Sequence, residues 1–479
     1  MSIIVSINSF VNGIVWGPYM LALLVGTGIF LTVRSGFMQF RHFGTIFKNT
    51  VGILHTPEAH KKNEFGVSPF QAVMTALAST VGTGNITGVA TAIALGGPGA
   101  VFWMWISAVF GMMTKFSEVV LSVHFREKNQ RGENVGGPMY YLEKGLHLKW
   151  LAVLFAIFAA FASFGIGNMT QSNAISTALQ STLGINPYLT GAVIVVIAAI
   201  VLLGGIQSIA KVTSTLVPIM GCAYAIFAIL ALIANAQEIP HALAVIFEGA
   251  FHPQSIAGGV AGYTVLMAIR FGVARGVFSN EAGLGSAPIA HAAAVTDSPV
   301  KQGFWGAFEV FFDTLVICTL TSLVIVSSGL YNNGMQGADL TIAAFGKAIG
   351  PLGTFGVTLA TVLFAISTIL GWSYYGEKSI EYLFKGKSYT EKLTKGYRAI
   401  FVLLAFVGAV SSLTLVWSIA DTLNGLMAIP NLIGVLALSG TVVQITKNYT
   451  KRKIKKDSED IEPMLSAFDD IQKEHAKQI

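Results

Sequence analysis

The sequence predicts an all-α polytopic membrane protein with eleven transmembrane helices, and its composition is the first reason. Hydrophobic residues make up 53% of the 479-residue chain and charged residues only 11%, whereas an ordinary soluble domain has about 25% charged residues. Glycine is also abundant, with 51 residues. This composition excludes disordered and nucleic-acid-binding chains, because too few side chains could stay in water or contact phosphates. Membrane lipid is therefore an expected partner and nucleic acid is not.

Apolar windows long enough to cross a bilayer are the second reason. A crossing takes about 20 residues, and such windows can be placed eleven times. They are residues 12–33, 69–95, 99–124, 150–178, 187–205, 209–235, 257–293, 303–328, 353–376, 398–415 and 417–445. The first window lacks a preceding basic region, so we expect a retained helix rather than a cleaved signal peptide. Cys222 and Cys318 lie in apolar stretches, and no disulfide or cysteine-based metal site is predicted.

The positions of the charges predict the orientation. Of the 30 Lys and Arg residues, 26 lie in the loops after windows one, three, five, seven and nine, or in the tail. Because cytoplasmic loops collect basic residues, the N-terminus is expected outside and the tail inside the cell membrane. The tail, from residue 447 onward, reads as a short solvated cytoplasmic segment.

Two windows carry polar, glycine-rich interruptions at their centres, which is the third reason for the predicted fold. The second window contains Ser79–Asn85, and the seventh contains Ser279–Ser286. Unwound backbone at membrane depth is tolerated only where it is buried in protein or lines a cavity. Close helix packing through small residues is the alternative explanation for such glycines.

The two interruptions lie five windows apart, which predicts two five-helix halves of opposite orientation. We expect residues 1–66 to hold an extra N-terminal helix and a cytoplasmic loop, 67–250 the first repeat, 251–446 the second repeat and 447–479 the tail. Broken helices at matching places in inverted repeats are typical of a transporter binding site near the midplane. Their freed N–H groups favour a carboxylate and their freed carbonyls favour a cation.

Three motifs carry a resemblance to a known family. They are Gly96–Gly111, which reads GGPGAVFWMWISAVFG, Ser279–Pro288, which reads SNEAGLGSAP, and Gly136–Tyr141, which reads GGPMYY. Together they resemble the alanine or glycine:cation symporter family, from the first window to the last. The resemblance implies sodium-coupled uptake of alanine or glycine, with Na⁺ as coupling ion, no organic cofactor and no enzymatic activity. It also implies a LeuT-like, five-plus-five fold with one extra N-terminal helix, and a monomer is compatible with it.

For the substrate carboxylate we expect the first interruption, through the backbone of Gly82, Thr83 and Gly84 and the hydroxyl of Thr80. The alternative for both threonines is a hydrogen bond back to a helix carbonyl. In the second interruption, the candidates to complete the substrate pocket are Ser279, Asn280 and Gly283.

Two further windows contribute to the predicted site through the resemblance. Gln171 is expected to form a polar wall, with an interfacial helix end as its alternative. Thr368 and Ser367, with the carbonyl of Ala78 or Gly82, are expected to hold sodium, since a hard cation prefers neutral oxygens. Trp372 lies four residues after Thr368 on the same helical face and is expected to flank the substrate, with packing or interfacial placement as its alternative.

Ionisable residues inside the windows are the last candidates. Glu281 either accepts backbone N–H bonds, which we favour, or receives a proton or positive partner. Lys115 and Glu118 are three apart and are expected to neutralise each other, as a structural pair or a gate. Arg275 is expected to pair with Glu309 or Asp313 of the eighth window, while Asp421 is read as an interfacial residue or a gate charge.

Other functions remain open at this stage. Proton-coupled amino acid transport needs the same fold, and an ion channel also uses unwound segments, although channels usually repeat the filter around a symmetry axis. Motifs of membrane-embedded enzymes such as H-E-x-x-H and G-x-S-x-G are absent from the sequence, and no catalytic residue is proposed.

Overall fold

A computed structural model describes residues 2–61, 66–252, 264–411, 414–455 and 461–468. Nearly all of them are helical, and the sheet among them is a two-residue antiparallel pair, β1 (Glu127–Lys128) with β2 (Asn134–Val135). The N-terminal part contains α1 (Ser2–Val15), α2 (Pro18–Arg34), α3 (Met38–Arg41), α4 (Phe43–Lys48), η1 (Val51–Ile53) and α5 (Pro57–His60). Proline at the start of α2 separates it from α1, because proline is favoured in a first turn and disfavoured further along a helix.

The first predicted interruption is a break in the helix. Helix α6 (Pro69–Thr80) begins with a capping box between Ser68 and Gln71. It ends at Thr80, and the chain resumes as the π-helical segment η2 (Gly84–Gly88), followed by α7 (Val89–Gly96). The following helix, α8 (Ala100–His124), is continuous.

The next part of the chain supplies further helices, of which α13 packs against α6. They are α9 (Pro138–Leu146), α10 (Lys149–Phe164), the π-helical η3 (Gly165–Met169), α11 (Thr170–Leu183), α12 (Pro187–Leu202), α13 (Gly205–Ala234), η4 (Ala236–Glu238) and α14 (Ile239–Phe251). The start of the seventh predicted window, residues 257–263, lies outside the described residues.

The second predicted interruption is also a break. Helix α15 (Val265–Asn280) ends where Glu281 takes a left-handed conformation, with φ of 56°. Gly283 and Gly285 also have positive φ, which glycine adopts at little cost, before the short helix α16 (Pro288–Ala292).

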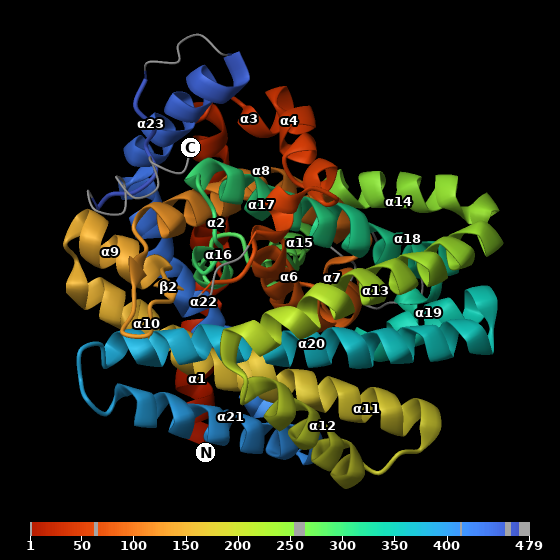
Figure 1. The fold of residues 1–479 in the computed structure, drawn as a ribbon. Helices are drawn as coiled ribbons and strands as arrows, with labels where there is room; N and C mark the ends of the chain where they lie inside the picture. Colours follow the sequence, from red (N-terminus) through yellow and green to blue (C-terminus); the bar gives the residue numbers. More distant parts are fainter. Residues whose placement is uncertain (1, 62–65, 253–263, 412–413, 456–460, 469–479) are drawn as a thin grey trace.

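The remaining helices complete the bundle. They are α17 (Pro299–Val310), the π-helical η5 (Phe311–Cys318), α18 (Thr319–Ser328), η6 (Leu330–Asn332), α19 (Gly337–Ile349), α20 (Pro351–Leu383), α21 (Thr390–Val410), α22 (Thr414–Ala437), α23 (Ser439–Tyr449) and η7 (Thr450–Lys455). The 33-residue α20 runs across the width of the molecule in Figure 1 and contacts α6, α10, α11, α13, α19 and α21.

Within the described residues, eight helices are long and apolar enough to cross a membrane, and Gly84–Gly96 and Pro187–Leu202 are shorter apolar helices. Large apolar side chains on α12 and α13, such as Ile200 and Ile233, are more than half exposed. Lipid is the environment in which such exposed apolar surface is stable. The protein is therefore a multi-pass membrane protein.

Loops that the charge pattern assigned to one side of the membrane meet in the structure. Lys301, in the first turn of α17, pairs with Glu58 of the first loop. Lys378, near the end of α20, contacts Glu133 and Glu381, each at 2.8 Å. The predicted alternation of loops between two sides agrees with these contacts.

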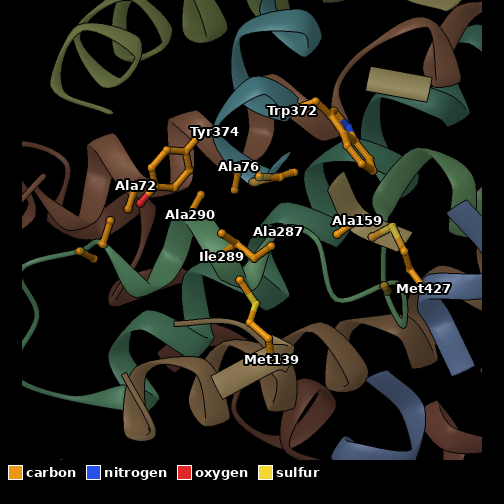
Figure 2. Close-up of a cluster of buried hydrophobic side chains, with 14 of the residues drawn as sticks. Ala72, Ala76, Met139, Ala159, Ala287, Ile289, Ala290, Trp372, Tyr374 and Met427 are labelled. Carbon is orange, nitrogen blue, oxygen red and sulfur yellow. The ribbon is translucent and has the colours of Figure 1, made fainter. Parts of the chain in front are cut away.

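The two breaks pack close to each other through small side chains. Figure 2 shows Ala287 and Ala290 beside Ile289, facing Ala72 and Ala76 of α6. Helix α16 contacts α6, α8 and α20, and these residues are fully or almost fully buried. Alanine at such contacts lets two helices approach closely, which brings both breaks into one region of the bundle.

Candidate functional site

A small buried cavity lies where the two breaks meet α11, α20 and α22. Its free space is about 20 Å³, and about 10–15 Å³ is enough for one water molecule, so an amino acid would enter only after the walls separate. Its wall is formed by Ser79, Thr80, Gly82, Thr83, Gly84, Ile166, Gln171, Phe278, Glu281, Thr368, Trp372 and Asn424.

The first break presents backbone donors at this cavity. The N–H of Gly82 is held by the Asn85 side-chain oxygen at 2.9 Å. Thr83 and Gly84 begin the second half of the broken helix, so their N–H groups have no acceptor in a preceding turn. Such a helix start carries a partial positive charge and is suited to an anion.

Three buried polar oxygens in the cavity wall have no hydrogen-bond partner among the described residues. They are the Thr83 hydroxyl, the side-chain oxygen of Gln171 and that of Asn424. The amide nitrogen of Gln171 donates to the carbonyl of Ile166 at 3.0 Å, which leaves its oxygen directed elsewhere. Because buried polar groups are nearly always paired, three unpaired oxygens around one cavity indicate a polar ligand.

Thr368 connects α20 to the first break. Its hydroxyl oxygen lies 3.1 Å from the Ala78 carbonyl and 2.9 Å from the Phe364 carbonyl. A side chain at Gly82 would approach the same hydroxyl to 2.3 Å, so the backbone of Gly82 also adjoins it. The Ser367 hydroxyl donates to the Phe364 carbonyl of its own helix and is not part of the cavity wall.

Trp372 and Thr80 both lie in the cavity wall. Trp372 packs against Gly167, where an added Cβ would lie 2.3 Å from the Trp372 Cβ. The Thr80 hydroxyl lies 3.3 Å from the Ala76 carbonyl and 3.4 Å from the Leu77 carbonyl. That bond back to the helix is the alternative that the sequence left open for Thr80.

The three candidates from the second break lie behind the cavity and not in its wall. Ser279 donates to Asp313 at 2.9 Å, Asn280 donates to Thr314 at 3.1 Å, and the Gly283 N–H donates to Glu118 at 2.9 Å. These bonds hold the shape of the break. The cavity instead receives Phe278 and Glu281 from this segment.

The buried charges have partners that differ from those expected. Among the described residues, Lys115 forms its ion pair with Glu309 and not with Glu118. The Lys115 nitrogen lies 3.5 Å from a carboxylate oxygen of Glu309. Arg275 pairs with Asp421 of α22 at 3.7 Å, so its expected pairing with Glu309 or Asp313 is wrong. The two expected partners are engaged elsewhere, because Glu309 pairs with Lys115 and Asp313 accepts from Ser279.

Glu281 accepts a hydrogen bond from the hydroxyl of Ser286, and it shares the cavity wall with Trp372. Its own N–H donates to the carbonyl of Val277 at the end of α15. Among the described residues, the Glu281 carboxylate thus holds Ser286 through a side-chain donor, and not through the backbone N–H donors that the sequence led us to expect.

Several residues of this region were not predicted. Phe278, Ile166 and Asn424 line the cavity. Asn85 of the first break donates to Asp313 at 2.7 Å, and Asp313 also accepts from Ser279 of the second break. Asn424 is a polar residue within an apolar window, and that signal could have identified it. Phe278 and Ile166 look like ordinary core residues in the sequence, so no pattern distinguished them.

Two charged groups outside the membrane segments have shifted pKa values. Burial lowers the pKa of Arg126 to about 10, and its guanidinium donates to the carbonyls of Ala292, Ala294 and Thr296. Burial alone would raise the pKa of Glu133, but Lys378 and Arg131 together hold it below its ordinary value. Through its three hydrogen bonds to backbone carbonyls, Arg126 fixes the chain that follows α16.

Asp313 is expected to matter for stability, because its carboxylate accepts from Asn85, Ser279 and Thr314. In Asp313→Ala these donors lose their acceptor, and a buried unsatisfied group costs about 1–3 kcal/mol. We expect a clearly lower melting temperature in detergent and a smaller loss for Asp313→Asn, which keeps one oxygen. Asp339→Ala, at an exposed position, is the control; equal melting of Asp313→Ala and the wild type would refute the role.

Known proteins are similar to this chain along most of its length. The model of the sodium:alanine symporter family matches residues 1–463. The sodium/alanine symporter AgcS of Methanococcus maripaludis is 51% identical over 455 residues, which are 93% of this chain and 97% of that protein. Two relatives come from Bacillus subtilis. The probable sodium/glutamine symporter GlnT is 39% identical, over 92% of this chain and 90% of that protein. The putative sodium/proton-dependent alanine carrier YrbD is 36% identical, over 92% of this chain and 92% of that protein.

Solved transporter structures share the fold. MhsT in complex with L-phenylalanine has a TM-score of 0.57 at 13% identity, covering 81% of this chain and 99% of that one. A Na⁺-coupled sialic acid symporter has a TM-score of 0.50 at 14% identity, with 98% and 95% coverage. The bundle is thus a LeuT-like transporter fold. With a family match along nearly its whole length, the chain belongs to the sodium:alanine symporter family, whose members are transporters and not enzymes.

Proposed function

We propose that the protein carries small neutral amino acids, alanine and glycine, into the cell together with sodium, by alternating access. The observation that carries the proposal is the set of three unpartnered oxygens, from Thr83, Gln171 and Asn424, around a cavity at the start of a half-helix. Relatives named as sodium/alanine and sodium/glutamine symporters support the substrate class.

The two ends of an amino acid match the two kinds of group in the cavity wall. The substrate carboxylate accepts hydrogen bonds from the N–H groups of Thr83 and Gly84 and from the Thr83 hydroxyl, where the helix dipole favours an anion. The ammonium donates to the side-chain oxygens of Gln171 and Asn424, which are acceptors without a donor. Gly82 contributes its backbone, and Thr80 lies in the same wall.

The apolar part of the wall limits the substrate side chain. Ile166, Phe278 and Trp372 line the cavity, and Trp372 cannot retreat toward η3 because it is packed against Gly167. A methyl group or a hydrogen fits such a space, so alanine and glycine are the expected substrates. Ser279, Asn280 and Gly283 act indirectly, by shaping the second break.

Sodium is proposed to bind beside the substrate, between the Thr368 hydroxyl and the carbonyl of Ala78, with the backbone of Gly82 adjoining. These are neutral oxygens of the kind that a hard cation prefers, and the ion would travel with the substrate as cargo. Ser367 was expected to contribute, but its hydroxyl is engaged with its own helix, so Thr368 carries the proposal. Sodium at this place neutralises the substrate carboxylate nearby, which links the two bindings.

The topology is proposed as eleven spans in the cell membrane, with the N-terminus outside and the tail in the cytoplasm. Residues 1–66 form the extra helix and first loop, 67–250 and 251–446 the two inverted five-helix repeats, and 447–479 the tail. The gathering of the basic loops on one side supports this arrangement. Each protomer contains a complete cavity, so a monomer suffices for transport.

Uptake by the purified protein in proteoliposomes tests the proposal. An inward sodium gradient should drive accumulation of labelled alanine and glycine, and a proton gradient alone should not. Gln171→Leu and Asn424→Leu should each raise the KM for alanine about tenfold, as expected for a lost buried hydrogen bond of about 1–3 kcal/mol. Gln180→Leu, exposed on the same helix as Gln171, is the matched control.

Accumulation driven only by a proton gradient would replace sodium by the proton-coupled alternative. Flux that never exceeds equilibrium across the membrane would indicate a channel. An unchanged KM in both leucine variants would remove Gln171 and Asn424 from the substrate site.

A further inference from the structure

The second break is surrounded by more buried negative charge than buried positive charge. Glu118, Glu281, Glu309 and Asp313 are at most 2% exposed, and Lys115 is fully buried among them. If every group were ionised, one lysine would face four carboxylates. An uncompensated charge at membrane depth is costly, so protons or cations must offset the excess.

His291 of α16 is placed to hold one of these protons. It is fully buried, and its Nε2 lies 2.9 Å from a carboxylate oxygen of Glu309, while its Nδ1 lies 2.8 Å from the amide nitrogen of Gln302. Neutral His291 therefore carries its hydrogen on Nε2 and accepts from Gln302 at Nδ1.

The side-chain amide of Gln302 has a second orientation, which a proton on Nδ1 of His291 would favour. Its side-chain oxygen is buried without a hydrogen-bond partner among the described residues. If Nδ1 of His291 gains a proton, rotation of the Gln302 amide brings this oxygen to the new N–H and satisfies both groups. The amide oxygen and nitrogen are interchangeable by such a rotation, so the pair has one arrangement for each protonation state of His291.

The side chain of Gln302 connects this pair to a larger cavity. Gln302 forms part of the wall of a cavity of about 510 Å³, lined also by Arg126, Asp297 and Lys301. These residues belong to the loops that gather on the proposed cytoplasmic side. When the Gln302 amide rotates away from Nδ1 of His291, water in that cavity can donate a proton directly to this nitrogen.

The charge of His291 acts on the second break through Glu309 and Lys115. Glu309 lies between His291 and Lys115, with a carboxylate oxygen 3.5 Å from the Lys115 nitrogen. That nitrogen has no hydrogen-bond partner in the described part of the chain. Lys115 also interacts electrostatically with Glu118 and Glu281. Glu118 holds the Gly283 N–H, and Glu281 lines the substrate cavity.

We propose that His291 is a proton-binding switch, loaded from the cytoplasmic cavity, that stabilises the closed form of the second break. Protonated His291 takes over the neutralisation of Glu309, so that Lys115 is free to neutralise the carboxylates that hold the break. Deprotonation restores the excess negative charge and favours opening. The other titratable groups that face the cluster include Tyr375 of α20, Tyr141 of α9 and the thiol of Cys318 of η5.

The first test measures transport at equal pH on both sides of proteoliposomes, under a fixed sodium gradient. Uptake of labelled alanine should fall several-fold as the pH drops from about 8 to about 6, because the closed form is then favoured. His291→Gln should abolish this dependence. His124→Gln removes another buried histidine, outside the network, and should keep it.

The second test does not depend on transport activity. Hydrogen exchange of residues 281–294 in the purified protein, with labelling times scaled for the intrinsic effect of pH, should show greater protection at about pH 6 than at about pH 8. The difference should be lost in His291→Gln and kept in His124→Gln.

The two measurements separate this switch from the proposed function, on which only the first one rests. Absence of sodium-driven uptake at every pH, with pH-dependent protection that His291→Gln removes, would refute the transport function and support the switch. Protection that follows sodium concentration but not pH would overturn the switch and assign a metal cation to the cluster. An identical pH profile in His291→Gln and the wild type would also overturn it.

Discussion

Gly82→Ala is expected to reduce sodium-driven alanine uptake about 10- to 100-fold. The new Cβ would lie 2.3 Å from the Thr368 hydroxyl oxygen, which is closer than real atoms approach, so the first break and α20 must separate. Forcing a methyl group into a packed site typically costs about 1–3 kcal/mol, and here the displaced atoms are those proposed to bind sodium. Initial uptake rates at several sodium concentrations would measure the loss.

Gly88→Ala is the matched control for this variant. Gly88 lies in the same broken helix, and an added Cβ there meets nothing within 4 Å. It should transport like the wild type, which would separate the effect of the site from that of helix propensity. Normal uptake in Gly82→Ala would mean that the approach of the first break to Thr368 is not needed for transport.

Thr368→Val should raise the sodium concentration needed for half-maximal uptake about tenfold or more. Valine keeps the shape of threonine but removes the hydroxyl, and with it the contact to the Ala78 carbonyl at 3.1 Å. Loss of one buried polar partner is worth about 1–3 kcal/mol, which corresponds to this change in affinity. Sodium titrations at saturating alanine, together with melting temperatures, would distinguish lost ion binding from lost stability.

Ser367→Ala is the companion to this variant, since the Ser367 hydroxyl bonds only to the carbonyl of Phe364 in its own helix. Its sodium requirement should stay close to that of the wild type. A larger shift in Ser367→Ala than in Thr368→Val would move the proposed sodium site to the other hydroxyl.

The sequence predicted the two breaks well, because their cause is local. Glycine and polar residues at membrane depth weaken a helix whatever surrounds it, and α6 and α15 end within the predicted segments. The shared placement of Thr368 and Trp372 was also predictable, since residues four apart lie on one helical face. Both line the same cavity.

Contacts between distant helices were not predictable in the same way. Whether Lys115 meets Glu118 or Glu309 depends on how α8 and α17 are rotated against each other, and a single sequence contains no measure of that rotation. Arg275 meets Asp421 for the same reason. Which side chains of the second break face the cavity likewise depends on left-handed residues such as Glu281. For this reason Ser279 and Asn280, which were expected in the cavity wall, lie behind it.

Some helices were missed because they do not look like membrane spans. Helices α9, α14 and α19 have 9, 13 and 13 residues, too few for a window of about 20 apolar residues. The sequence predicted that the bundle has a hydrophobic core, but not that these short helices help to enclose it.

Coupling of the two fluxes is the central claim, and radiolabelled sodium tests it most directly. Proteoliposomes that contain the purified wild-type protein should take up labelled sodium faster when alanine is present outside, and labelled alanine faster when sodium is present. Gln171→Leu should weaken the effect of alanine on sodium entry, and Thr368→Val should weaken the effect of sodium on alanine entry. Sodium entry that is the same with and without alanine would contradict the account.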